Sequence, residues 1–87
     1  FAKDVKRSKP YPDIFLKACS DLNVLPENCL VLEDSEAGIE AASRAGIPVI
    51  CIPDLKIPAQ SFLNKTEQVF QDLDAVRDYL ESKKEVF

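Results

Sequence analysis

The chain has 87 residues, of which 46% are hydrophobic, and it carries a formal net charge of −4 with no histidine. A chain of this length forms at most one small domain, and its apolar content is that of a folded protein rather than a disordered one. The acidic balance argues against a nucleic acid or an anionic membrane as partner, and the lack of histidine excludes Ser-His and Cys-His catalysis within these residues.

The first expected element is a helix that begins near Pro12, after an extended lead-in over residues 1–9. Proline suits the first turn of a helix, and Asn23 is a plausible left-handed residue at its end. The residues of its apolar stripe are Ile14, Phe15, Ala18, Cys19 and Leu22. Residues 29–32, with the sequence CLVL, are continuously apolar and predict a strand that is covered on both faces.

A second helix is expected over residues 36–45, with Ser35 as its N-cap and Gly46 at its end. Residues 48–52 predict a second buried strand, followed by a short helix near 59–64 and a short strand over 68–70. The last element is an amphipathic helix over 73–83. Its inward residues are expected to be Leu73, Val76 and Leu80. This alternation predicts an α/β fold, with a short parallel sheet of about three strands and helices on both faces.

The three cysteines, Cys19, Cys29 and Cys51, lie inside apolar runs. Their odd number and the lack of close C-x-x-C spacing favour reduced, buried thiols over a disulfide framework or a zinc site. We therefore expect a cytoplasmic protein. No apolar run approaches the length of about 20 residues that spans a bilayer, so no membrane contact is expected.

Two adjacent acids, Glu33 and Asp34, follow the first expected strand directly. In a parallel sheet, ligands bind beyond the carboxyl ends of the strands, and Mg²⁺ takes carboxylate oxygens as ligands. Lys9 is the natural cationic companion for a transferring phosphoryl group, and the proline after it restricts its backbone. From the residues alone, two other roles remain open. The acids could favour the following helix N-terminus, and Lys9 could be a solvated surface lysine.

The segments SKPYPDIF (8–15) and CLVLEDSEAGIEAASRAGIPVI (29–50) together resemble the haloacid dehalogenase-like (HAD) hydrolases, most closely the beta-phosphoglucomutase-like phosphatase group. The resemblance implies a partial Rossmannoid three-layer fold. It implies catalytic roles for Lys9, which would bind phosphate and the nucleophilic aspartate, and for Asp34, a direct Mg²⁺ ligand. Glu33 would be a second ligand or an outer partner through water, and Ser35 would line the phosphate site and cap the helix.

The sequence departs from the family at its nucleophile. The family's first motif, Asp-x-Asp after an apolar strand, its second-motif Ser or Thr and its cap domain are not found ahead of Lys9. Asp72-Leu73-Asp74 has the right spacing but follows a poor strand, so helix capping by Asp72 is favoured. Ser8 stands where many relatives have glycine. The resemblance thus implies that residues 1–87 are the carboxyl-terminal part of a HAD-like core domain.

The function that follows is that of a fragment of a Mg²⁺-dependent phosphohydrolase, either a phosphatase or phosphoglucomutase-like, which acts on a small phosphorylated metabolite and is inactive alone. A second interpretation is a non-catalytic α/β module that binds a partner or Mg²⁺. A receiver-like phosphoacceptor domain fits less well, because its lysine should follow the acids. We also expect self-association through strand 29–32, since in the family this strand pairs with the one that carries the nucleophile, and an open apolar edge binds other chains.

Overall fold

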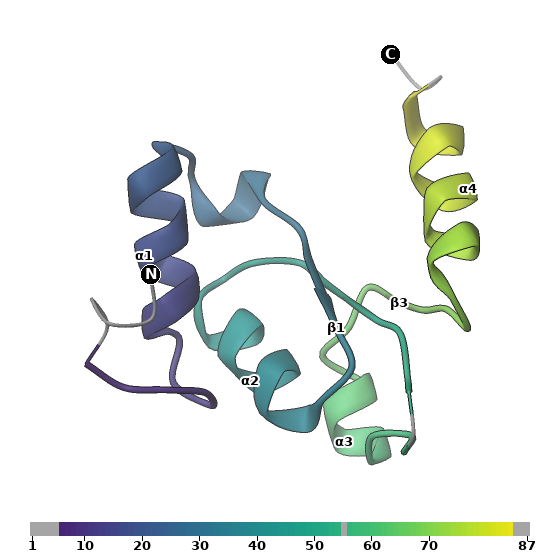
Figure 1. Cartoon of the computed structure of the whole chain (residues 1–87), viewed down its shortest axis with the longest axis horizontal. Coiled ribbons are helices and arrows are strands. Elements are labelled where there is room, and N and C mark those ends of the chain that lie inside the picture. The colour runs from purple at the N-terminus through teal and green to yellow at the C-terminus, as the bar shows by residue number, and fades with distance from the viewer. Residues whose placement is uncertain (1–5, 55, 85–87) are drawn as a thin grey trace.

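The computed structural model describes residues 6–54 and 56–84, so residues 1–5 of the expected lead-in lie outside the described part. Helices and strands alternate along the chain, as the sequence predicts (Figure 1). In order they are α1 (Asp13–Leu22), the 3-10 turn η2 (Pro26–Asn28), β1 (Val31–Glu33), α2 (Glu36–Arg44), β2 (Val49–Cys51), α3 (Gln60–Leu63), β3 (Gln68–Val69) and α4 (Leu73–Lys84).

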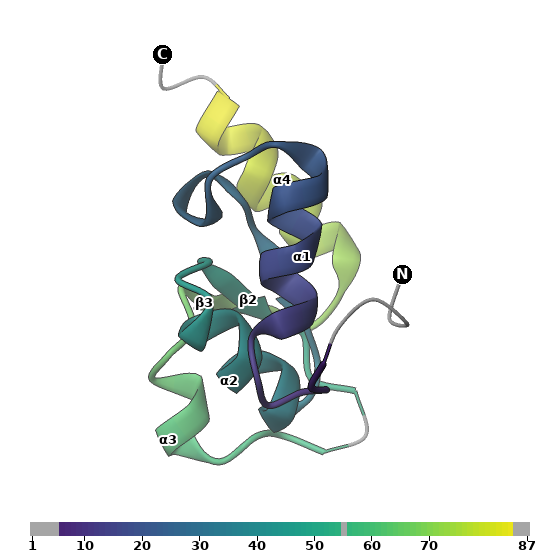
Figure 2. The same cartoon turned by 90° about the vertical axis from the view of Figure 1, so that its left-hand side faces the viewer.

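The three strands form a parallel sheet in the order β1-β2-β3. Val31 lies opposite Val49 in the first pair, and Ile50 lies opposite Gln68 in the second. Helices α1 and α2 lie on one side of the sheet and α4 lies on the other, as the two perpendicular views agree (Figures 1 and 2). The prediction of an α/β fold with a parallel sheet between helical layers is confirmed.

The core is concentrated between the sheet and helices α1 and α2. One cluster of buried side chains joins α2 to β2 and consists of Ile39, Ala42, Val49 and Cys51. A second cluster joins α1 to the end of α2 and consists of Cys19, Ala45 and Ile47. Phe15 and Val31 pack against both clusters, so these two residues hold the first helix and the first strand to one continuous core.

The ends of the helices follow the capping chemistry that the sequence predicts. Ser35 caps α2, because its Oγ accepts a hydrogen bond from the Gly38 N–H at 3.0 Å. Asp72 caps α4 in the same way, with its Oδ1 accepting from the Ala75 N–H at 2.9 Å. Asn23 ends α1 with a left-handed backbone (φ 56°), and Gly46 follows α2 with φ 76°.

Three expectations about packing are wrong. The first strand begins at Val31 rather than at residue 29, and it is not covered on both faces, since Leu32 is 44% exposed. The reason is that Leu32 lies on the sheet face opposite the core residues Val49 and Cys51, and at the edge strand β1 this face stays open.

Leu22, Leu73 and Leu80, expected to point inward, are 71%, 65% and 37% exposed, whereas Val76 is buried as expected. Leu22 is the last residue of α1 and Leu73 the first of α4, where each helix leaves the packed surface. Leu80 lies farther along α4 and is partly covered.

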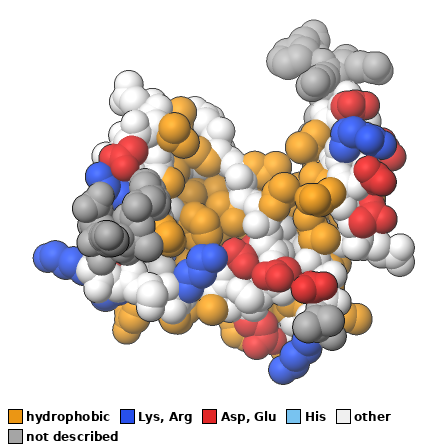
Figure 3. Space-filling model, viewed as in Figure 1, with side chains coloured by type: hydrophobic (Ala, Val, Ile, Leu, Met, Phe, Trp, Pro, Cys, Tyr) orange, Lys and Arg blue, Asp and Glu red, His pale blue; other side chains and the backbone are white. Residues whose placement is uncertain are grey.

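An apolar surface remains open beside β1. The space-filling view shows hydrophobic side chains gathered in the hollow between the α1 side of the molecule and α4 (Figure 3). We call it the open apolar face; its exposed members are Leu30, Leu32, Leu73 and Leu80. Within the described ranges, no helix is both long and apolar enough to cross a membrane.

Candidate functional site

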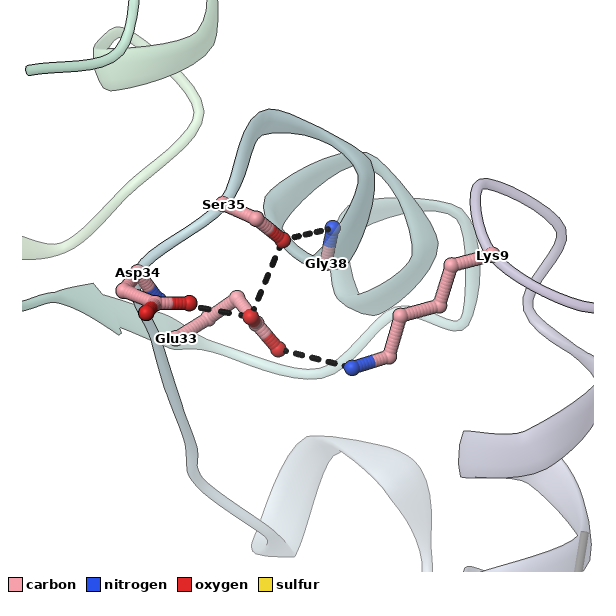
Figure 4. A network of polar contacts seen from close by, with 5 residues as sticks. All are labelled: Lys9, Glu33, Asp34, Ser35 and Gly38. Carbon is pink, nitrogen blue, oxygen red and sulfur yellow. Dashed lines mark hydrogen bonds and ion pairs between the residues drawn. The ribbon is translucent and has the colours of Figure 1, made fainter. Parts of the chain in front are cut away.

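The candidate site lies where β1 ends and α2 begins. Glu33 is the last residue of β1, and Asp34 and Ser35 form the short connection to the first turn of α2. Lys9 reaches the same place from the segment that precedes α1 (Figure 4). Residues far apart in the sequence are therefore joined at the carboxyl edge of the parallel sheet, where ligands bind in folds of this class.

The ammonium group of Lys9 is held between an acid and an aromatic ring. Its Nζ donates a hydrogen bond to Glu33 Oε2 at 3.1 Å and lies 5.4 Å from the centre of the Phe15 ring in α1. The Lys9 side chain is still 38% exposed. The contacts with Glu33 and Phe15 hold the positive charge in place while one side of it remains open to a ligand.

The segment that carries Lys9 is itself tied to the start of α1. Arg7 Nη2 lies 3.0 Å from Asp13 Oδ1, and the Arg7 guanidinium lies 4.3 Å from the centre of the Tyr11 ring. The hydrogen bond from Arg7 lowers the pKa of Asp13 below its usual value. Asp13 is also the acid in the first turn of α1, where negative charge favours the helix N-terminus.

The Glu33 carboxylate is engaged through both of its oxygens. Besides Lys9, it accepts hydrogen bonds at Oε1 from Ser35 Oγ at 3.1 Å and from the Asp34 N–H at 3.3 Å. Its side chain is only 11% exposed. Burial alone would raise the pKa of Glu33, but the hydrogen bond and charge of Lys9, aided by Ser35 and the Asp34 amide, outweigh it and lower the pKa. Glu33 is therefore a carboxylate that stays ionised in a largely buried position.

Gly38 provides the space in which the Glu33 side chain lies. A Cβ at position 38 would stand 1.9 Å from Glu33 Cδ and 2.2 Å from both Cγ and Oε2. Such distances are far below van der Waals contact, so only glycine fits while Glu33 keeps its position. The same glycine donates its N–H to Ser35 Oγ, so one residue supports both the helix cap and the acid (Figure 4).

The Asp34 carboxylate, in contrast, forms no hydrogen bond or ion pair with any other residue of the described chain. Asp34 is exposed and lines an open hollow at the carboxyl ends of the strands. Asp54, Asp72 and Asp74 line the same hollow, although Asp54 lies in the loop after β2, Asp72 caps α4 and Asp74 lies in the first turn of α4. Figure 3 shows acidic side chains gathered along this part of the surface. Asp34 is thus the acid of the pair that is available to a ligand.

The oxygen donors at the end of β1 are of the kind that a hard cation such as Mg²⁺ binds. Among residues 6–54 and 56–84, however, no group of three or more His, Cys, Asp or Glu residues could hold a metal ion together. Asp34 offers an uncommitted carboxylate, whereas both oxygens of Glu33 are occupied by other contacts. The described residues therefore fit a partial ligand set centred on Asp34.

Comparison with known proteins decides the family. The sequence profile of the haloacid dehalogenase-like hydrolases matches residues 1–52. The chain belongs to this family. It is 42% identical over 76 residues to validoxylamine A 7'-phosphate phosphatase from Streptomyces hygroscopicus subsp. limoneus, an alignment that covers 87% of this chain and 35% of that protein.

Solved structures of HAD proteins share the fold. The beta-phosphoglucomutase of Clostridium difficile has a TM-score of 0.75 at 31% identity, covering 94% of this chain and 35% of that one. A HAD family hydrolase from Deinococcus radiodurans, solved with bound phosphate and sodium, has a TM-score of 0.76 at 30% identity, covering 87% and 35%. These matches confirm the predicted HAD-like Rossmannoid fold. The chain spans about a third of the length of these relatives.

The structure brings three of the four predicted site residues, Lys9, Glu33 and Ser35, into one hydrogen-bonded group, with Asp34 beside it. Their roles in binding phosphate and metal stay predictions. Sequence reasoning missed Gly38, although a glycine in the first turn of a helix is a signal, because glycine there is unfavourable without a reason. It also missed that Asp54, Asp72 and Asp74 share a hollow with Asp34, which depends on how the strand ends are placed.

Proposed function

We propose that this chain supplies the lysine and the acidic metal-binding residues of a Mg²⁺-dependent phosphohydrolase, a phosphatase or phosphoglucomutase-like enzyme, and that residues 1–87 are the carboxyl-terminal part of its HAD-like core domain. The observation that carries the proposal is the Lys9–Glu33 pair at 3.1 Å beside the uncommitted carboxylate of Asp34. It stands at the carboxyl end of a parallel strand in a chain whose relatives include phosphatases.

Lys9 supports this reaction by providing a positive charge that is already oriented. Glu33 and the Phe15 ring fix the ammonium, so a phosphoryl oxygen that approaches its open side meets a donor that needs little reorganisation. Glu33 holds this lysine in position, and it is itself held by Ser35 and the Asp34 amide. Ser35 lines the phosphate site next to the N-terminus of α2, where the helix dipole favours an anion.

Asp34 is the proposed direct ligand of Mg²⁺, and Glu33 acts as a second ligand or through a bound water. The occupied oxygens of Glu33 favour the indirect role. Bound Mg²⁺ supplies neutralisation of the charge on the phosphoryl group. Asp34 is suited to this task because its carboxylate is exposed on the hollow at the ends of the strands.

The nucleophilic aspartate is proposed to lie outside these 87 residues. Asp72-Leu73-Asp74 is the local alternative, but Asp72 caps α4, and Asp74 forms an ion pair with Arg77 at 3.6 Å. We therefore propose that the 87-residue chain alone has no turnover. The substrate is proposed to be a small phosphorylated metabolite. The named substrate of one relative is a phosphorylated small molecule, validoxylamine A 7'-phosphate, and another relative is a phosphorylated carbohydrates phosphatase.

We propose that the protein works in a reducing compartment such as the cytoplasm. This is supported by Cys19, Cys29 and Cys51, which are free thiols that form no disulfide in the described chain.

The second proposal concerns self-association. The edge of β1 that does not face β2 has no strand beside it in the described chain. We propose that in the 87-residue chain this edge, with the open apolar face next to it, pairs with a second copy.

The experiment that tests the proposed function measures Mg²⁺-dependent hydrolysis of small phosphate esters by the full-length protein and by the 87-residue chain. In the full-length protein, Lys9→Ala and Asp34→Ala should each lower kcat/KM by about 10²–10³-fold, as expected when preorganised charge is removed. Glu33→Ala should cost less. Asp21→Ala on the surface of α1 is the matched acid control and should leave the rate unchanged.

Full activity of the Asp34→Ala protein would overturn the proposal. Equal losses for Glu33→Ala and Asp34→Ala would mean that both acids bind the metal directly. Turnover by the 87-residue chain alone would instead direct attention to Asp72 and Asp74 as nucleophile candidates.

A further inference from the structure

Two of the three cysteines lie in contact although ten positions separate them in the sequence. Cys19 Sγ lies 3.5 Å from Cys29 Sγ. Cys19 is on α1, and Cys29 follows the turn η2 in the stretch that leads into β1. The two sulfurs are thus brought together by the packing of the first helix against the start of the first strand.

The surroundings of the two thiols differ in a way that suits a stepwise reaction. Cys19 is 5% exposed, whereas Cys29 is only partly buried. The Cys29 thiol also lies 3.4 Å from the Leu25 carbonyl oxygen and donates its proton there, which leaves its sulfur lone pairs free to face Cys19. Burial and the neighbouring Cys29 raise the pKa of Cys19. An incoming reagent therefore reaches Cys29 first.

We propose that Cys19 and Cys29 form a reversible disulfide when the protein meets a small-molecule disulfide such as glutathione disulfide, while Cys51 stays a thiol. The bond requires the two sulfurs to close from 3.5 Å to about 2.0 Å. Cys29 can supply this movement because it lies in an extended connection (φ −106°, ψ 169°) rather than inside a helix or strand. Cys51 has no comparable neighbour, since it is fully buried in the centre of the sheet.

The reaction consists of two exchange steps. In the first, the Cys29 thiolate attacks one sulfur of glutathione disulfide, whose S–S bond breaks and releases one glutathione thiolate. In the second, the Cys19 thiolate attacks the Cys29 sulfur of this mixed disulfide, and the second glutathione thiolate leaves. Each protein thiol loses its proton and the pair loses two electrons, while glutathione disulfide gains both and becomes two molecules of glutathione.

The disulfide would join the second half of α1 to the entry of β1. These two elements carry Phe15 and Glu33, which hold Lys9 on either side. Oxidation would thus link α1 covalently to the segment that leads into β1, and the polar groups of the candidate site would take no part in the bond.

Tryptic digestion places Cys19 and Cys29 in one peptide and Cys51 in another, which allows the test. No lysine or arginine lies between Lys17 and Arg44, so one tryptic peptide, 18–44, contains both Cys19 and Cys29, and peptide 45–56 contains Cys51. The folded chain is equilibrated in glutathione buffers of rising oxidised-to-reduced ratio, and free thiols are blocked with an alkylating reagent. The chain is then digested without reduction and examined by mass spectrometry.

We expect peptide 18–44 to change from a doubly alkylated form to an unalkylated form that is lighter by two hydrogens than the free dithiol. Peptide 45–56 should stay alkylated at the same ratios, and dithiothreitol should restore both thiols of peptide 18–44. In Cys19→Ser, a glutathione adduct should accumulate on Cys29. In Cys29→Ser, Cys19 should stay reduced because it is buried.

Three results would overturn the proposal. They are a peptide 18–44 that stays doubly alkylated throughout, a wild-type chain that accumulates only glutathione adducts, and crosslinks between peptides 18–44 and 45–56 at the same ratios. The Cys51→Ser chain serves as the matched control, because its peptide 18–44 should oxidise as in the wild type.

Discussion

Replacing Gly38 with alanine tests how tightly the candidate site is built into the first turn of α2. Alanine in place of glycine inside a helix ordinarily stabilises a protein by about 0.5–1 kcal/mol. Here the new Cβ would stand 1.9 Å from Glu33 Cδ, so the Glu33 side chain must rotate away. The rotation removes its contacts with Lys9, Ser35 and the Asp34 amide.

The magnitude follows from those contacts. The displaced Glu33 carboxylate regains water, so each of its hydrogen bonds to Ser35 and to the Asp34 amide counts at a net value of about 1 kcal/mol. Lys9 is 38% exposed, so solvent screening reduces the value of its ion pair to at most about 1 kcal/mol. After subtraction of the roughly 0.5–1 kcal/mol that alanine adds to a helix, we expect Gly38→Ala to lower the free energy of unfolding by about 1–2 kcal/mol. Urea unfolding followed by circular dichroism measures this change.

A double-mutant cycle isolates the cause. The three nearest contacts of the new Cβ all belong to Glu33 atoms that Glu33→Ala removes, so in that background Gly38→Ala should stabilise the chain by about 0.5–1 kcal/mol. Gly46→Ala is the control, since it is strained by its φ of 76° and meets no atom within 4 Å. Its cost should be equal in both backgrounds. If Gly38→Ala stabilises the wild-type chain, the space at Gly38 is not what positions Glu33.

Three further predictions follow from the same geometry. Because Lys9 lowers the pKa of Glu33, the stability that this carboxylate confers is complete above its unfolded pKa of about 4.3 and is lost as the pH falls through the lower folded pKa. The difference in unfolding free energy between the wild type and Glu33→Gln should therefore shrink below about pH 4, and a difference that grows in acid would contradict this assignment. Asp72→Ala should destabilise the chain by about 1 kcal/mol, because it removes the cap of α4, while the activity of the full-length protein persists; loss of activity at unchanged stability would instead support a nucleophile. The 87-residue chain should sediment as a dimer at tens of micromolar, and Leu32→Lys on the exposed edge of β1 should return it to a monomer, whereas a stable wild-type monomer would exclude pairing through β1.

Much of the fold could be predicted because its signals are local. Residue type alone indicates helix ends at Ser35, Asn23 and Asp72, and the structure has each of them at a helix end. The short apolar runs likewise predict the strands from neighbouring residues alone. The exposure of Leu32 could not be predicted, since it depends on β1 being an edge strand, which is a property of the sheet order.

The candidate site shows the same division. The motif residues Lys9 and Glu33 could be identified, and so could Asp34, because their spacing is characteristic of a family. Their mutual geometry could not, because it depends on three-dimensional packing. The space above Gly38 and the contact of Cys19 with Cys29 arise only when α1, β1 and α2 are placed against one another.

Phe15 carries a consequence for anyone who alters this protein. The ring that packs against both core clusters also contacts the Lys9 ammonium, so the hydrophobic core and the candidate site share this side chain. Looser packing of the core would therefore increase the mobility of the Lys9 ammonium, and heating should do so before the chain unfolds. A substitution at Phe15 is therefore expected to change both the stability of the core and the position of Lys9.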